Sequence, residues 1–523
     1  MSETLYNGIV LPDEWPPRTV EYESTDELPV PYLDAPPDVI PVDVGRQLFV
    51  DDFLIARSTL RRTFHTARLH PASPVLVPET EQELDGGHCP GAGPFNDGVW
   101  FDPEDGLFKM WYMSGWLTGI AHATSTDGIS WQRPKLDVIP GTNQVLNPPR
   151  GWRRDGGLVW RDPQAGPAAR YRMFLFFRRP DGEGGRLYTA PDGIHWKQAA
   201  TTSPCGDNTT FFYNPFRNRF VFSIRQGWPN RGRAYHEHPD FVRAGQWTPG
   251  AQVWWARADR RDKPDPLVGD TPQLYDLNAV AYESIMLGAF NILYGPQNHV
   301  GMRTGEPKII DMQLGFSRDG FHFSRPHRHA FIPCSRKEGT WNRAYIHTAG
   351  GLCLVRGDEL WFYYTAFSGK SQKLKPGEGG NDDHRPDYPM YAGASTGLAV
   401  LRRDGFASMD APGNGGSLET RPVTFTGNHL FVNADLGEGE LRAEVLAADG
   451  SVIAPFSRSA CVPVTGNTTK ARVTWRDANS LAQLSGRPVR FRFLLTSGRF
   501  YAFWVSAAEN GDSNGHLPSE GPA

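Results

Sequence analysis

A strand-turn-strand unit that recurs along the chain restricts the fold of this sequence more than any other feature. Three copies share one frame: residues 96–112, 154–177 and 207–225 each give an apolar strand, a turn opening with Asp-Pro or Asn-Pro, and a second strand rich in aromatic residues. The residue before proline avoids helical geometry and proline fixes its own φ, so this dipeptide marks a turn. Such repetition predicts units that bury their apolar faces against one another.

Two weaker copies and a second signature extend the pattern. The weaker copies lie at 275–294 and 345–366. An Asp-Gly turn, in which glycine supplies the positive φ of a tight hairpin, follows four of the units. These turns lie in residues 125–131, 190–196, 317–323 and 402–408. Five units of the same internal order predict an all-β fold with a five-bladed β-propeller, whereas an array of β-sandwiches gives no reason for that order.

Composition changes at both ends of the repeat. The first 45 residues are rich in proline and acidic residues and could not bury a core alone, so we expect an arm that lies on another part of the protein. Beyond a stretch of small residues, alternating apolar and polar positions predict a separate sandwich. The expected order is an extended arm (1–45), a five-bladed β-propeller (46–410), a linker (411–420), a C-terminal β-sandwich (421–508) and a disordered tail (509–523).

The charge balance argues against nucleic-acid and membrane partners. With 54 basic and 58 acidic residues the net charge is −4, so no overall positive field attracts polyanions. The five cysteines form no Cys-x-x-Cys pair, which favours free thiols over a disulfide framework or a zinc site. The N-terminus does not resemble a signal peptide and no long apolar run follows, so a cytoplasmic location is expected. Homo-oligomer formation is left open.

Three aspartates occupy related places in consecutive units. Asp155 and Asp207 each lie eight residues before the proline of their turn, and Asp97 lies six before its own. An offset of two keeps a strand side chain on the same face. The first strand of each blade lines the central channel, so the three carboxylates are predicted to meet at one channel mouth. Turn-capping aspartates are the simpler alternative. Carboxylates gathered in this way suit glycoside hydrolysis by an acid and a nucleophile or base.

The blades, the aspartates at the channel mouth and the trailing sandwich resemble glycoside hydrolase families 32 and 68. The blades alone are also similar to families 43, 62 and 130, and residues 70–79 (HPASPVLVPE) resemble the stretch that opens such propellers. The resemblance makes Asp97 the nucleophile or base. The family's Arg-Asp-Pro matches residues 161–163, but the repeat frame places these at the far end of the strand. Asp155 therefore takes the blade 2 role, and Asp162 is a turn residue.

The acid of the third blade has no direct match, because the family's Glu-Cys motif is absent. Asp207 takes that place by position, and Glu283 or Glu338 could supply the acid instead. No His/Asp/Glu spacing supports a transition-metal site, so neither metal nor cofactor is expected. The resemblance to family 43 leaves a structural calcium beside His347 open.

Substrate contacts are expected from strand starts and from the loops that join the second and third strands, because both lie on the same face. These loops are 113–119, 178–185, 225–232, 295–307 and 369–390. Tryptophans there offer stacking surfaces, and arginines and histidines offer polar contacts. The candidate substrate-binding residues are Asn96, Asn208, Trp116, Arg178, Arg225, Trp228, Asp276, His299, Asn342 and His347.

The sequence thus predicts a glycosidase that cleaves a fructofuranosyl or arabinofuranosyl linkage of a glycoside or oligosaccharide. A phosphorylase of the family 130 type is the first alternative, in which a basic cluster would face the carboxylates. The second is a non-catalytic carbohydrate-binding propeller, for which the tryptophans would matter and the aspartates would not.

Overall fold

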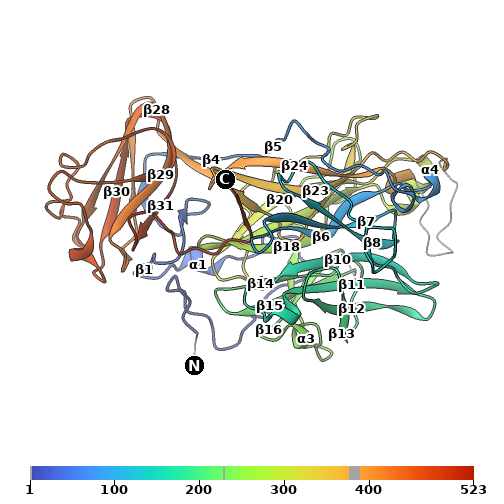
Figure 1. Cartoon of the computed structure of the whole chain (residues 1–523). Helices are drawn as coiled ribbons and strands as arrows, with labels where there is room; N and C mark the ends of the chain where they lie inside the picture. Colours follow the sequence, from blue (N-terminus) through green and yellow to red (C-terminus); the bar gives the residue numbers. More distant parts are fainter. Residues whose placement is uncertain (1–2, 228–229, 376–388, 523) are drawn as a thin grey trace.

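Short runs of aromatic and branched apolar residues form mainly antiparallel sheets, as their strand preference dictates. The computed structural model describes residues 3–227, 230–375 and 389–522. Its α-helices are short connections: α1 (Pro31–Asp34), α2 (Glu81–Leu84), α3 (Phe241–Ala244) and α4 (Asn298–Thr304). Figure 1 shows two bodies, a propeller on the right and a smaller β-domain, orange to red, on the left.

The first three blades are four-stranded antiparallel sheets in which the strands follow one another in order. Blade 1 has β6 (Ala92–Asp102), β7 (Leu107–Ser114), β8 (Gly119–Ser125) and β9 (Gln144–Leu146). Blade 2 has β10 (Arg153–Arg161), β11 (Tyr171–Arg179), β12 (Gly182–Ala190) and β13 (Lys197–Thr201). Blade 3 has β14 (Thr210–Asn214), β15 (Arg219–Gln226), β16 (Gly232–His238) and β17 (Val253–Arg257).

Blade 4 has three strands and blade 5 is closed by a segment from the beginning of the chain. Blade 4 consists of β18 (Gln273–Tyr282), β19 (Ile285–Gly295) and β20 (Ile309–Ser317). Blade 5 has β21 (Ala344–Thr348), β22 (Leu354–Arg356), β23 (Glu359–Phe367) and β24 (Ala394–Arg402). On its outer edge β24 pairs with β5 (Arg68–Leu69). The five-bladed propeller predicted from the repeat is confirmed.

The C-terminal β-domain is centred on β28 (His429–Leu446), whose first half pairs with β31 (Arg499–Ser506) and whose second half pairs with β30 (Arg490–Leu495). In β30 arginines alternate with buried phenylalanines, so one face packs in a core. The other strands are β1 (Ile40–Pro41), β2 (Gln47–Leu48), β3 (Ile55–Ser58), β4 (Arg61–Phe64), β25 (Ala407–Asp410), β26 (Gly416–Thr420), β27 (Val423–Thr424) and β29 (Val464–Arg472).

The domain limits differ from those expected. Strands β2, β3 and β4 precede the propeller in sequence but pair within the sandwich sheet, and the expected linker contains β26. The tail expected to be disordered is ordered over its described residues, 509–522: β32 (Glu520–Gly521) pairs in parallel with β22, and the backbones of His516 and Glu283 exchange hydrogen bonds. These contacts are made by the main chain with distant elements, which a polar local sequence does not reveal.

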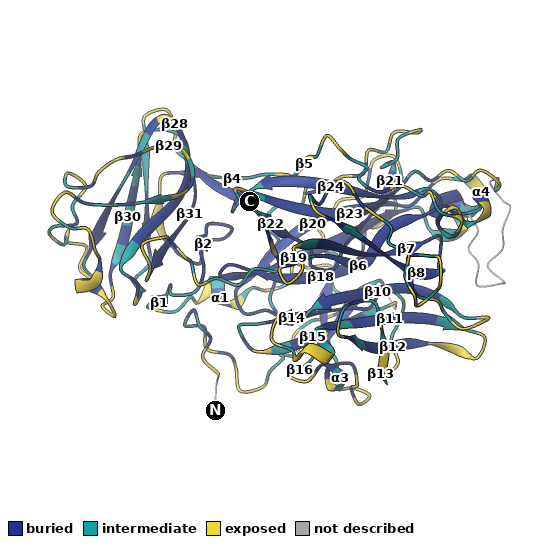
Figure 2. Ribbon diagram, viewed as in Figure 1, coloured by how far each residue is buried: buried dark blue, intermediate teal, exposed yellow. Residues whose placement is uncertain are grey.

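The arm packs on the body of the protein through apolar and polar contacts. Leu5, Ile9 and Leu11 are buried, and the Tyr32 hydroxyl donates a hydrogen bond of 3.1 Å to the carbonyl of His322. Figure 2 shows burial concentrated in the inner strands of the blades and exposure at their outer turns. Among the described residues no helix is both long and apolar enough to cross a bilayer.

Candidate active site at the channel mouth

A cavity of about 290 Å³ lies at one mouth of the propeller channel, and every blade contributes to it. Its lining consists of Phe95, Trp116, Leu117, Asp155, Arg178, Asp207, Asn208, Arg225, Arg231, Tyr275, Asn298, Lys308, Tyr345 and Tyr391. Helix α4, which holds Asn298, lies at the end of the propeller opposite the C-terminal β-domain in Figure 1. We call this cavity the mouth pocket.

Two carboxylates from adjacent blades share one arginine in the mouth pocket. Asp155, at the start of β10, accepts a hydrogen bond of 2.9 Å from Arg178 Nε. Asp207, just before β14, is bound by Arg178 Nη2, and Arg225 Nη1 lies 2.8 Å from its other oxygen. Burial favours protonation of Asp207, but Arg225 and Arg178 outweigh it, so the pKa of Asp207 is lowered. Asp207 is therefore held as a carboxylate.

Asp97 lies beneath the mouth pocket and does not line it. Its side chain has no exposed surface and is paired with Arg154, which is also fully buried. Burial raises the pKa of Asp97 to about 6, against the opposing effect of Arg154. Gly157 permits this arrangement, because a Cβ there would lie 2.9 Å from Asp97 Oδ1 and 2.5 Å from a Leu175 methyl.

The displacement of Asp97 follows from the local backbone. Asn96 and Asn208 both have positive φ, 64° and 54°, and so mark equivalent positions in blades 1 and 3. The residue before Asn208 is Asp207, whereas the residue before Asn96 is Phe95, and both line the mouth pocket. Asp97 follows Phe95 by two residues, and the positive φ of Asn96 between them interrupts the extended strand. Asp97 is therefore buried against Arg154 instead of lining the pocket.

A layer of polar side chains fills the channel below the pocket. His347 Nε2 lies 3.2 Å from Asn208 Oδ1, and the Thr348 hydroxyl donates to Asn96 Oδ1 at 2.6 Å. Asp276 is fully buried, and Arg233 Nη2 lies 3.7 Å from its Oδ1. Burial lowers the pKa of His347 to about 4, which keeps the ring neutral near pH 7. This layer supports the floor of the pocket, and Asn208 is the member that also lines it.

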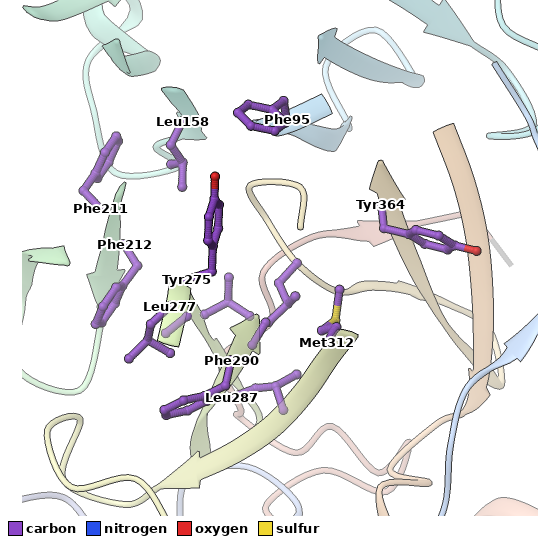
Figure 3. Packing of buried hydrophobic residues seen from close by; sticks show 14 of the residues in the cluster. Phe95, Leu158, Phe211, Phe212, Tyr275, Leu277, Leu287, Phe290, Met312 and Tyr364 are labelled. Carbon is purple, nitrogen blue, oxygen red and sulfur yellow. The ribbon is translucent and has the colours of Figure 1, made fainter. Parts of the chain in front are cut away.

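Aromatic rings form the pocket wall. Trp116 stacks on Tyr391 with ring centres 4.4 Å apart, and Phe95 lies 4.0 Å from the His347 ring. The hydroxyls of Tyr275 and Tyr345 are 2.9 Å apart. In Figure 3 the Tyr275 hydroxyl points away from Leu277 and Phe290, toward the side where Phe95 lies. The wall is thus continuous with the apolar core, which fixes its position.

Two cations line the pocket without a carboxylate partner. Lys308, just before β20, is 2% exposed, and its Nζ donates to the Tyr391 hydroxyl at 2.7 Å. The Arg231 guanidinium lies over the Tyr275 ring at 4.9 Å. Within residues 3–227, 230–375 and 389–522, no Asp or Glu forms an ion pair with either group. Burial first, and then Arg231, lowers the pKa of Lys308 well below its ordinary value.

The structure brings only part of the predicted set into the mouth pocket. Asp155, Asp207, Asn208, Trp116, Arg178 and Arg225 line it, and Asn96, Asp97, Asp276 and His347 lie in the layer below. Glu338 and His299 are exposed and, like Asn342, do not line the pocket. Trp228 lies outside the described residues. The strand starts of blades 2 and 3 and three loop residues therefore meet in the pocket as expected from position, and the catalytic and substrate-binding roles of these residues stay predictions.

Glu283, offered as an alternative acid, lies away from the pocket. It directly follows β18, beside the C-terminal segment, where its carboxylate accepts 2.7 Å and 3.1 Å hydrogen bonds from the Ser513 hydroxyl and the Arg46 backbone N–H. Its side chain is fully buried, and burial raises its pKa. This position assigns Glu283 to the joint between the propeller and the tail.

Several lining residues were not singled out from sequence. They are Phe95, Leu117, Arg231, Tyr275, Asn298, Lys308, Tyr345 and Tyr391. Leu117, Arg231 and Asn298 fall within the loops expected to shape the pocket, so loop position was the available signal. Lys308 directly precedes an apolar strand and carried no signal of its own. Among the described residues no group of three His, Cys, Asp or Glu side chains is arranged to hold a metal ion.

No protein-family model matches the sequence, and no curated protein matches it. Among solved structures the chain is similar to a β-1,2-mannobiose phosphorylase from Listeria innocua (11% identity, TM-score 0.43, 64% of this chain and 96% of that one). It is also similar to an exo-β-1,3-galactanase from Phanerochaete chrysosporium (10%, TM-score 0.37, 82% and 98%). A third is a fructofuranosidase from Schwanniomyces occidentalis in complex with fructosylnystose (12%, TM-score 0.37, 84% and 99%). At 10 to 12% identity the likeness extends to the fold alone.

Proposed function

We propose that the chain is a glycoside-cleaving enzyme whose active site is the mouth pocket. The observation that carries the proposal is the pair of carboxylates, Asp155 and Asp207, that adjacent blades bring to one arginine inside a walled cavity. Glycosidic bond cleavage needs two such groups, one to donate a proton to the leaving oxygen and one to act as nucleophile or to activate water. Aromatic rings in the wall are suited to contact the apolar face of a sugar.

The electrostatics divides the roles. Asp207 is held ionised by Arg225 and Arg178, so it suits the base or nucleophile rather than the acid that its place in blade 3 suggests. Asp155, the other carboxyl that lines the pocket, takes the acid role by elimination. Asp97 acts as a positioning residue, because it neutralises Arg154, the neighbour of Asp155 in the chain.

The substrate class we propose is a fructofuranoside or arabinofuranoside, bound with its terminal sugar in the pocket. Phosphorolysis is the second candidate reaction. The basic side chains of Arg178, Arg225, Arg231 and Lys308 outnumber the two lining carboxylates, and such an excess favours an anionic nucleophile.

The test is a panel of aryl furanosides and pyranosides assayed with and without inorganic phosphate, on the full chain and on three variants. Asp155→Asn and Asp207→Asn should each lower turnover by about 100-fold or more. Asp162→Asn is the matched control: it has the same residue type in the same blade, but its carboxylate pairs with Arg172 outside the pocket. It should keep turnover within a few-fold.

The outcomes separate the candidates. Turnover that needs phosphate and yields a sugar phosphate identifies a phosphorylase. Sugar binding without turnover of any glycoside, unaffected by Asp155→Asn and Asp207→Asn, would favour a non-catalytic carbohydrate-binding propeller. Near-normal activity in both variants would remove the carboxylate pair from the mechanism.

A further inference from the structure

The mouth pocket contains more positive charge than its own carboxylates balance. Arg178 forms ion pairs with three carboxylates, those of Asp155, Asp207 and Glu183, the last at 2.6 Å. Arg225 shares Asp207. These contacts leave Arg231 and Lys308 without a carboxylate at ion-pair distance among the described residues, although Asp207 attracts both from farther away.

Arg231 and Lys308 lie in the same part of the pocket, against the ring of Tyr275. Arg231 Cζ is 4.9 Å and Lys308 Nζ 5.2 Å from the centre of Tyr275. Lys308 also lies 5.7 Å and 4.9 Å from the centres of Tyr345 and Tyr391. Ring faces and a hydroxyl stabilise an ammonium group only in part, and a buried cation without an anion is costly. Lys308 is buried and Arg231 half-buried, and two cations that line one cavity are suited to receive an anion.

From this arrangement we propose that Arg231 and Lys308 form a subsite for an oxyanion. The anion is either part of the glycoside, as a uronate carboxylate or a sulfate ester, or free inorganic phosphate. A guanidinium and an ammonium bind such oxygens through charge-assisted hydrogen bonds. The role of this subsite in catalysis rests on the proposed function of the mouth pocket. Anion binding does not, because it can be measured by itself.

The binding experiment uses the full chain titrated with sodium phosphate, sodium sulfate, sodium glucuronate and, as a neutral reference, glucose, with calorimetry and the thermal midpoint as readouts. The oxyanions should bind and raise the midpoint, and glucose should not. Arg231→Gln and Lys308→Met should each weaken oxyanion binding about tenfold or more. Arg243→Gln and Lys337→Met, which alter exposed cations outside the pocket, should bind as the natural chain does.

A second arm identifies the source of the anion. Faster cleavage of an aryl uronide or sulfated glycoside than of its neutral counterpart, without phosphate, places the oxyanion on the substrate. Cleavage of neutral glycosides that rises with phosphate makes phosphate the co-substrate.

The inference is overturned if no oxyanion binds, or if oxyanions bind equally well to Arg231→Gln and Lys308→Met with both variants folded. If Lys308→Met does not fold, Arg231→Gln decides alone. Oxyanion binding that depends on Arg231 and Lys308, with no glycoside cleaved, upholds the subsite and contradicts the proposed function instead. Cleavage of neutral glycosides without any oxyanion binding upholds the proposed function and contradicts the subsite.

Discussion

The buried carboxyl of Asp97 should make folding take up a proton between about pH 6 and pH 4. Its pKa in the folded protein is about 6, compared with an ordinary value of 3.8, because burial disfavours the charge. The folded chain therefore binds the proton more tightly than the unfolded chain. The contribution of Asp97 to stability is complete below about pH 3.8 and is lost as the pH rises through 6.

The magnitude follows from the two pKa values. At about 1.36 kcal/mol per pKa unit, the interval from 3.8 to 6 corresponds to about 3 kcal/mol, of which about 2 kcal/mol falls between pH 7.5 and pH 4.5. Asp97→Asn removes the titrating group. Any cost of leaving Arg154 unpaired in this variant is independent of pH in this range. As the pH falls from 7.5 to 4.5, the free energy of unfolding of the natural chain should therefore increase by about 2 kcal/mol relative to that of the variant.

Urea unfolding at pH 7.5, 6.5, 5.5 and 4.5, followed by tryptophan fluorescence, measures this difference. Asp127→Asn is the control, because the pKa of Asp127 is lowered to about 2 and its titration lies outside the range. Its difference from the natural chain should stay constant. A constant difference for Asp97→Asn as well would show that Asp97 stays ionised throughout.

Three further predictions concern the anion, the metal and the tail. Sulfate affinity should fall as the pH rises from 6 to 9. Burial, Arg231 and Arg225 favour loss of the proton from Lys308, whereas the bound anion, like Asp207 and Asp155, favours its retention, so binding weakens as Lys308 loses its proton. Lys308→Met should show no dependence of affinity on pH in this range, and the same result for the natural chain would contradict the prediction. Treatment with EDTA should leave turnover within a few-fold, and a loss restored by calcium would point to an ion site. Deletion of residues 509–523 should lower the free energy of unfolding by ~2–5 kcal/mol, since it uncovers the buried Trp504 ring and removes the Ser513 hydroxyl that donates to Glu283. An unchanged urea midpoint would refute the role of the tail.

The repeat made the five blades predictable because each unit contains its own strands and turns. The pocket was predictable where strand register alone positions a residue, as for Asp155 and Asp207. The prediction failed for Asp97, because the register of β6 shifts between Gly93 and Gly98, and the face on which a side chain is expected does not set its depth in the channel. Lys308 and the C-terminal tail depend on contacts with distant blades, which no local pattern encodes.

The pairing of β5 with β24 has a consequence for synthesis. The segment that closes the ring emerges before blade 1, whereas its partner β24 emerges about 330 residues later, so the ring cannot close until blade 5 has been made. Every blade also lends a side chain to the mouth pocket. A nascent or truncated chain thus has neither a closed ring nor a complete pocket, and ligand binding there reports that the last blade has joined the first.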